Sequence, residues 1–452
     1  MKAVFFSSLF CFISWISLAQ GTPSLETFTL KNGLKVYMIK YGKIEAVHLE
    51  LSVNCGKKNE VPGQQGFNNM VSSLLLKGNT KYTEEVQNDK AFAIGCELTG
   101  GAGFDRTTLS ANVLTKNVET AIDLMSAAMR FPKFEKDKLD QLVAYQTSYN
   151  SPAKMDIAAQ AARYSNCVVH GTANPLGRTT NKNQLKQITV QQLKDFHAFN
   201  FTPKNTGLLI CGNFDPNQIK SLLEKYFGDW ESVYGEVNGV MLERPVIKKK
   251  ELFFVNRTGA NQCALRWNKI GPSVKDKDYL AFTIANQIFS QVLFREIREI
   301  GGKTYGISSF LQPSSFSNVL SIACSVRSEE MANTIALFDK TLREFVQGNF
   351  TKDEFDNEIT RFKTDQFLNE HPEELANFYN PIAYDFKTRV KMVSDINTLT
   401  MEDVKKAIKK YYTPDIYKLV IAGDETRVEA QLKNIQNVKK LSATDLENYS
   451  VQ

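Results

Sequence analysis

Two residues in the segment FREIREIGGKTYGIS, Arg298 and Tyr305, carry side chains that could act on a peptide. An Arg guanidinium can hold a peptide carbonyl or carboxylate through two parallel donors. A Tyr hydroxyl can donate to an oxygen on which negative charge develops during a reaction. Taken alone, the same residues also fit a surface arginine at a helix end and a packed strand tyrosine beside Gly301 and Gly302.

Metal-ligating residues are few. The chain has four histidines, and none stands at ligand spacing to another histidine or to a cysteine pair: His48, His170, His197 and His371. No Cys-x-x-Cys motif occurs. His197 lies on the face of a predicted helix, where packing or solvation is the ordinary role. The sequence therefore predicts no zinc site built from histidine and cysteine.

The N-terminal residues predict export. One Lys precedes an apolar run that ends in Ser17-Leu18-Ala19, with small residues at both positions that a signal peptidase reads. We expect residues 1–19 to be a signal peptide, and the mature protein to be periplasmic. No later stretch approaches 18 consecutive apolar residues, so no membrane span is expected.

Composition indicates a globular chain. At 452 residues with 42% hydrophobic residues, it is long enough for at least two cores. The six cysteines after residue 19 are widely scattered and lie mostly in apolar runs, which favours buried single thiols over disulfides. The net charge of +6 is spread along the chain, and this argues against a nucleic-acid partner.

The most informative feature is an internal repeat, because residues 188–213 align without gaps on residues 399–424. Both copies predict a Thr-capped helix, a Thr-Pro break and a buried strand ending at Gly. The recurring residues are Thr189, Thr202, Pro203, Ile210 and Gly212, matched by Thr400, Thr413, Pro414, Ile421 and Gly423.

The repeat predicts an α+β protein made of two homologous half-domains, residues 24–235 and 249–452, joined by a linker at 236–248. Each half is expected to open with strands. TFTLKNGLKVYMIK places an Asn-Gly turn between two alternating runs, which predicts a hairpin. We expect a mainly antiparallel sheet flanked by helices in each half, with the halves facing each other as a clamshell.

With these features, the sequence resembles the insulinase or pitrilysin-type metallopeptidases, the inverzincin family, in its short two-half form. The resemblance covers nearly the whole chain after residue 19. The segments that carry it are LKNGLKVYMIK, PGQQGFNNMVSSLLLKGNTKYT, LTGGAGFDRTTL, both Thr-Pro blocks and FREIREIGGKTYGIS.

Active members of that family carry H-x-x-E-H on the helix that PGQQGFNNMVSSLLLKGNTKYT resembles. Two imidazoles at positions i and i+4 share one helical face and can bind one Zn²⁺. The resemblance assigns these positions to Asn69, Ser72 and Ser73, which are neutral and weak zinc ligands. The family's third ligand, a Glu, would fall near Ala144, and the nearest carboxylate there is Asp140.

The resemblance also gives Arg298 and Tyr305 a role, because short family members use an Arg and a Tyr at this spacing to hold substrate opposite the zinc half. The glycine-rich loop that some relatives carry before this motif is replaced by ANQIFSQVLF. LTGGAGFDRTTLSANVL resembles the edge strand on which substrate pairs as an added strand, although an ordinary hairpin bend fits its glycines equally well.

The resemblance implies a non-catalytic, substrate-binding subunit of a heterodimeric zinc peptidase. The partner would be a homologous subunit that carries H-x-x-E-H and the zinc, while this chain needs no cofactor and binds peptide substrate through Arg298 and Tyr305. Alone it is expected not to hydrolyse peptides. The alternative is a purely structural subunit, similar to the ligandless family members in a respiratory complex, in which this pair has no task.

Overall fold

The computed structural model describes residues 23–149, 155–180, 182–232, 234, 242–312, 318–367, 371–383, 385–443 and 445–448. The expected signal peptide, residues 1–19, and residues 236–241 of the expected linker lie outside this part of the chain. Among the described residues, no helix is both long and apolar enough to span a bilayer.

The first half is built on a six-stranded mixed sheet in the order β1-β2-β6-β3-β5-β4. All neighbouring strands are antiparallel except β2 and β6. The strands are β1 (Ser24–Thr29), β2 (Lys35–Lys40), β3 (Ala46–Val53), β4 (Glu97–Ala102), β5 (Thr107–Leu114) and β6 (Thr206–Gly212).

The second half repeats this design with the order β12-β7-β11-β8-β10-β9. The strands are β7 (Glu251–Asn256), β8 (Gln262–Gly271), β9 (Thr304–Gln312), β10 (Asn318–Arg327), β11 (Lys418–Gly423) and β12 (Val438–Leu441). Five strands match those of the first sheet in order and direction. Only the outer strand differs, because β1 runs antiparallel to β2 whereas β12 runs parallel to β7.

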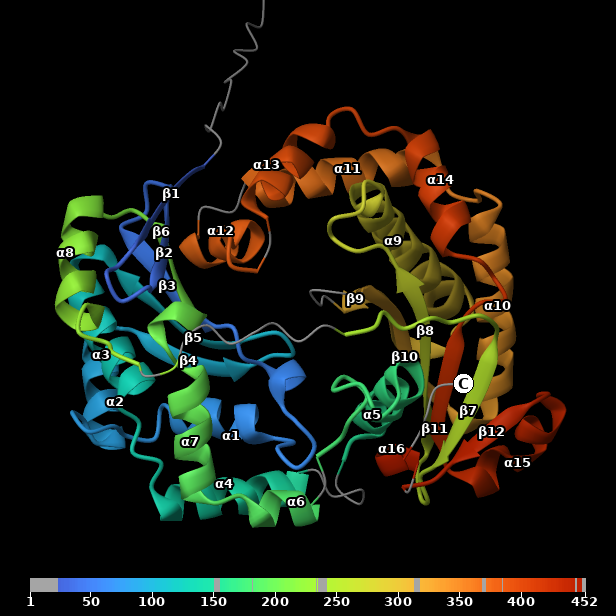
Figure 1. Ribbon diagram of the computed structural model, residues 1–452. Helices are drawn as coiled ribbons and strands as arrows, with labels where there is room; N and C mark the ends of the chain where they lie inside the picture. The colour runs from blue at the N-terminus through green and yellow to red at the C-terminus, as the bar shows by residue number, and fades with distance from the viewer. Residues whose placement is uncertain are drawn as a thin grey trace, which may run out of the picture.

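Helices cover both sheets, and Figure 1 shows most of them on the outer sides of the two lobes. Those of the first half are α1 (Phe67–Leu74), α2 (Glu84–Ala93), α3 (Val118–Arg130), α4 (Lys136–Tyr149), α5 (Ile157–His170), α6 (Lys182–Gln187), α7 (Val190–Asn200) and α8 (Pro216–Phe227). Those of the second are α9 (Tyr279–Leu293), the π-helix η4 (Phe294–Ile300), α10 (Met331–Val346), α11 (Lys352–Phe367), α12 (Pro372–Tyr379), α13 (Phe386–Asp395), α14 (Met401–Tyr411), α15 (Glu425–Asn434) and α16 (Asp445–Asn448).

The duplicated blocks fold alike because their local signals are alike. Thr189 caps α7 and Thr400 caps α14, each in a reciprocal capping box with the third residue of its helix. The buried strands β6 and β11 follow, as the repeat predicts. The predicted hairpin is also present, because β1 pairs with β2 through a turn in which Gly33 has φ +97°.

The two halves exchange one helix each. Helix α5 of the first half packs on the second sheet, where Val168 and Val169 join a buried cluster with Phe253 and Val420. The buried Lys418 of β11 donates to the carbonyl oxygen of Val168 at 2.6 Å. Figure 1 shows α5 against the inner side of the second sheet and α12 against the inner side of the first.

Helix α12 makes the reciprocal contact. Its Leu375 and Tyr379 form a buried cluster with Ile39 and Leu209 of the first sheet. Glu373 accepts a hydrogen bond from the Asn112 amide at 2.7 Å. Each lobe therefore contributes one helix that packs on the sheet of the other lobe. The sequence repeat did not predict this exchange.

Candidate functional site

The helix that resembles the family's zinc helix is α1, and a carboxylate fixes its start. Gly66 caps α1 with φ +98°, a left-handed conformation that favours glycine. The buried Glu60 accepts hydrogen bonds from the backbone N–H groups of Gly66 at 3.0 Å and Asn68 at 2.9 Å. Negative charge at a helix N-terminus is favourable, so Glu60 stabilises the first turn of α1.

The three positions that the resemblance assigns to zinc ligands lie within α1 as i, i+3 and i+4. Asn69 is exposed, Ser72 is buried and Ser73 is half-buried. The Ser72 hydroxyl lies 3.5 Å from the carbonyl oxygen of Asn69 and donates to it. A carboxamide and two hydroxyls supply neither a thiolate, an imidazole nor a carboxylate, so these residues do not fit a structural or catalytic zinc ion.

Helix α4 does not complete a metal site either. Ala144 is exposed, and Asp140 is an exposed partner of Lys136 on the same helix. Gln146 is the α4 residue that reaches the cavity beside α1. Within the described ranges, no group of three His, Cys, Asp or Glu side chains is placed to hold a metal ion.

A buried polar network around Asn68 holds the first turn of α1 in place. The sequence analysis did not predict this network. Asn68 donates to the carbonyl oxygen of Gly56 at 2.7 Å and accepts from the Cys55 thiol at 3.2 Å and the Thr107 hydroxyl at 3.3 Å. Burial raises the pKa of Cys55 to about 12, so its thiol stays protonated. The network positions the helix without offering a nucleophile.

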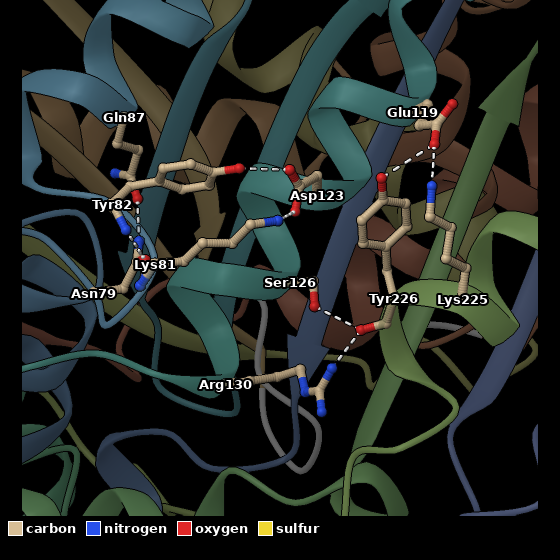
Figure 2. Close-up of polar contacts among 10 residues, drawn as sticks. All are labelled: Asn79, Lys81, Tyr82, Gln87, Glu119, Asp123, Ser126, Arg130, Lys225 and Tyr226. Atoms are coloured by element: carbon tan, nitrogen blue, oxygen red, sulfur yellow. Dashed lines mark hydrogen bonds and ion pairs between the residues drawn. The ribbon is translucent and has the colours of Figure 1, made fainter.

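The segment after α1 is tied to neighbouring helices. In Figure 2, Asn79 donates to Gln87 of α2 at 2.8 Å, while Tyr82 donates to Asp123 of α3 at 2.7 Å and Lys81 forms an ion pair with the same carboxylate. Asn79 also accepts from the backbone of Lys81 and Tyr82. Asn79, Lys81 and Tyr82 therefore hold this segment against α2 and α3.

Helix α3 is in turn attached to α8. Figure 2 shows the Tyr226 carbonyl oxygen accepting from Ser126 at 2.7 Å and from Arg130, and Glu119 accepting from Tyr226 at 3.1 Å and Lys225 at 2.7 Å. These contacts link the exit of α1 to the outer helix layer. The framework around the degenerate zinc-site positions is thus fixed on several sides.

Strand β4 forms the edge of the first sheet beside α1, as the resemblance implies. A Cβ atom at Gly100 would lie 2.9 Å from the backbone oxygen of Ser72, so only glycine fits this approach without a shift. Gly100 therefore lets the edge strand approach the helix closely.

A cavity of about 380 Å³ lies where α1, the end of β4, α4 and α5 meet. Its lining includes three cations, Lys57, Arg163 and Arg178, and one carboxylate, Glu60. Burial lowers the pKa of Lys57, and the charges of Arg163 and Arg178 lower it further, while Glu60 acts in the opposite direction. Burial also raises the pKa of Glu60. We call this site the basic cavity.

The histidines lie elsewhere. His197 is buried, its Nε2–H donates to the carbonyl oxygen of Met129 at 2.9 Å, and its ring stacks on Phe201. Burial lowers its pKa to about 4. His170 at the end of α5 and His48 in β3 are also buried, whereas His371 is exposed before α12. His197 thus has the packing role expected for it.

Arg298 and Tyr305 lie in the second half, on the π-helix η4 and at the start of the edge strand β9. Tyr305 is 89% exposed. The Arg298 guanidinium lies over the Phe294 ring, 4.5 Å from its centroid, and is otherwise exposed. Within the described chain, neither side chain forms a hydrogen bond or an ion pair, so their donors face solvent.

The segment between the two residues is held by its backbone. The N–H of Gly302 donates to the Arg298 carbonyl oxygen at 3.1 Å, and the N–H of Lys303 donates to that of Ile297 at 3.0 Å. The ladder of β9 with β10 shifts register between Cys324 and Val326, opposite Tyr305. An irregularity of this kind at a sheet edge redirects side chains. Both residues therefore extend from a fixed backbone.

The two-lobed, duplicated fold and the helix site without zinc ligands define an inactive-type, two-half member of a metallopeptidase class. The profile described as Insulinase (Peptidase family M16) matches residues 35–180, and the profile described as Peptidase M16 inactive domain matches residues 187–362. The chain belongs to the insulinase family, peptidase family M16.

Two relatives of this chain have low sequence identity to it. The zinc protease PqqE of Helicobacter pylori is 23% identical over 286 residues, which are 60% of this chain and 62% of that protein. The chain thus matches less than two thirds of the length of PqqE. A mitochondrial-processing peptidase subunit beta of Lentinula edodes is 20% identical over 434 residues, 89% of this chain and 90% of that protein.

Solved structures share the fold. A peptidase M16 inactive domain from Pseudomonas fluorescens superposes with a TM-score of 0.78 at 20% identity, covering 89% of this chain and 98% of that one. The periplasmic protease PqqL from Escherichia coli gives 0.75 at 15% identity, with 89% of this chain covering 46% of that chain. At these identities the likeness establishes the fold alone.

Proposed function

We propose that this chain is the non-catalytic, substrate-binding subunit of a heterodimeric zinc peptidase that degrades peptides or unfolded protein segments. The observation that carries the proposal is the contrast between the halves. Asn69, Ser72 and Ser73 offer no zinc ligand, whereas Arg298 and Tyr305 expose charged and hydroxyl donors without a partner among the described residues. Such a contrast suits a chain that contacts substrate but leaves the metal to another subunit.

The zinc would be held by a homologous partner that carries H-x-x-E-H. The zinc-bearing half would polarise the peptide carbonyl, and this chain would supply donors from the opposite wall. Arg298 suits a carbonyl or carboxylate because its guanidinium presents two parallel donors. Tyr305, on an edge strand, can reach a peptide that runs beside β9. We also propose export to the periplasm, supported by the N-terminal residues and by the periplasmic relative PqqL.

Isolation of the native complex tests this proposal. A tagged chain, purified under native conditions from its own cells, should bring down one H-x-x-E-H homologue in about equal amount. The complex should cleave a quenched fluorescent peptide, and each chain alone should be far slower. Recovery of the chain only within a large assembly without a zinc-bearing homologue would favour the purely structural role.

A further inference from the structure

The three cations of the basic cavity are held by neutral groups. Lys57 donates to the carbonyl oxygen of Arg178 at 2.7 Å, and Arg163 donates to that of Thr180 at 3.1 Å. The Arg178 guanidinium donates to the backbone oxygens of Thr172, Glu60 and Ala173. Carbonyl oxygens orient these side chains but do not neutralise their charge.

The carboxylate in the lining, that of Glu60, is already engaged. Its two oxygens accept from the backbone N–H groups of Gly66 and Asn68 and from the Asn68 amide. It lies buried at 5% exposure beneath α1. The cavity therefore keeps an excess of positive charge on three half-buried side chains, and an anion bound there would compensate it.

The cationic side chains of the basic cavity still have N–H donors available for a ligand. An ammonium carries three N–H donors and a guanidinium carries five, and the side chains of Lys57 and Arg163 each donate one hydrogen bond within the described chain. A flat anion with two oxygens, such as a carboxylate, matches the guanidinium fork. Apolar atoms of Met155, Ala159 and Leu185 complete the lining, which fits a carboxylate attached to an organic chain.

The position of the cavity indicates what carries the carboxylate. Ala102 and Gly103, at the end of the edge strand β4, are part of its lining. The Lys57 backbone N–H donates to the Gly103 carbonyl oxygen at 3.0 Å, so this lysine is anchored at the end of that strand. A peptide added to β4 as a further strand would therefore pass beside the three cations.

We propose that the basic cavity binds a carboxylate of an extended peptide that pairs with β4, so that the degenerate zinc-site half selects acidic or C-terminal peptide segments. This inference rests on the proposed function, in which peptides are the substrate. The carboxylate is either the α-carboxylate of the peptide C-terminus or an Asp or Glu side chain, and the chemistry of recognition is the same.

Binding of matched peptide pairs to the chain without substitutions distinguishes an α-carboxylate from a side-chain carboxylate. The chain from residue 20 onward is titrated with fluorescein-labelled ten-residue peptides, one pair differing by a free or amidated C-terminus and one by an internal Asp or Asn. The free carboxylate should tighten binding about tenfold in at least one pair, because charge-assisted hydrogen bonds are lost without it. Equal affinities within both pairs overturn the proposal.

Variants then locate the site. Arg163→Gln should abolish the preference for the carboxylate, and Arg163→Lys should keep part of it, since the charge remains but the fork is lost. The matched control is Arg343→Gln, which removes an exposed α10 arginine paired with Asp415. A preference that survives in folded Arg163→Gln overturns the assignment. If that variant does not fold, Arg163→Lys decides, because an unchanged preference there contradicts fork recognition.

The outcome is separable from that of the proposed function. Peptide binding here uses this chain without a partner, whereas the proposed function is tested by cleavage in the heterodimer. If peptides show no carboxylate preference but cleavage by the heterodimer requires Arg298, only the proposal for the basic cavity is contradicted. If the carboxylate preference depends on Arg163 but cleavage requires neither Arg298 nor Tyr305, only the proposed role in the heterodimeric peptidase is contradicted.

Discussion

Gly100 of the edge strand β4 lies directly against the backbone of Ser72 on α1, so close that a Cβ atom would stand 2.9 Å from the Ser72 carbonyl oxygen. The contact gives a physical reason for glycine at this position in a chain without zinc ligands. The glycine serves the packing of strand on helix, whatever chemistry the helix performs.

Gly100→Ala should therefore lower the free energy of unfolding by about 1–3 kcal/mol, the usual cost of overpacking. Gly101→Ala is the matched control, because its Cβ would lie 3.4 Å from the Thr108 hydroxyl, a side-chain atom that can yield. Urea unfolding of both variants measures the difference. Equal stability of the two variants would show that the Gly100–Ser72 contact is not tight in solution.

The exchanged helices predict that the two lobes unfold together. Leu375→Ala removes buried apolar atoms of α12 from the first sheet and should cost about 2–5 kcal/mol. Trp230 reports on the first half and Trp267 on the second, and both are buried. In single-tryptophan variants of the chain from residue 20, both signals should shift to lower urea concentration by the same amount. Separate transitions would mean that the exchange does not couple the lobes.

The local parts of this fold could be predicted from the sequence. Asn32-Gly33 forms the predicted turn, and the capping boxes of Thr189 and Thr400 start the duplicated helices, because these signals act over a few residues. The exchange of α5 and α12 could not be predicted, since both helices fit their own half equally well by pattern. Only the packed sheets decide which face each helix covers.

The site was predicted in part. The resemblance placed Asn69, Ser72 and Ser73 on one short helix, but its spacing could not indicate that Ser72 is buried and Asn69 exposed. The basic cavity joins Lys57 to Arg163 and Arg178, more than 100 residues later, so no local pattern marks it.

Buried histidine makes the fold sensitive to acid. The folded-state pKa of His197 lies at about 4, below the ordinary 6.5, so the unfolded chain binds the proton more readily. Its contribution to stability is fully present above about pH 6.5 and is lost as the pH falls toward 4. The loss is on the order of 3 kcal/mol.

His197→Gln should make the stability profile less steep between pH 6.5 and 4, as measured by urea unfolding at several pH values. Part of the slope should remain, because burial also lowers the pKa of His170 to about 4. His371→Gln changes an exposed histidine before α12 and serves as the control, with an unchanged profile expected. A profile that stays equally steep without His197 would assign the acid sensitivity to other groups.

Zinc content provides a further prediction. Because the three assigned ligand positions of α1 carry only a carboxamide and two hydroxyls, the chain purified without chelator should contain well under one Zn per molecule by elemental analysis. The described residues include no cluster of His, Cys, Asp or Glu that would change this expectation. About one tightly bound Zn per chain would contradict the assignment of the metal to the partner.

The cleavage rate of the reconstituted heterodimer with Arg298→Ala or Tyr305→Phe tests most directly whether this chain supplies donors to the substrate. Each variant is mixed with the zinc-bearing partner, heterodimer formation is confirmed by size, and hydrolysis of a quenched fluorescent peptide is followed; Arg343→Gln is the control. Assembly should be normal and turnover should fall on the order of 100-fold, as for removal of a transition-state donor. Wild-type rates in both variants would contradict this role.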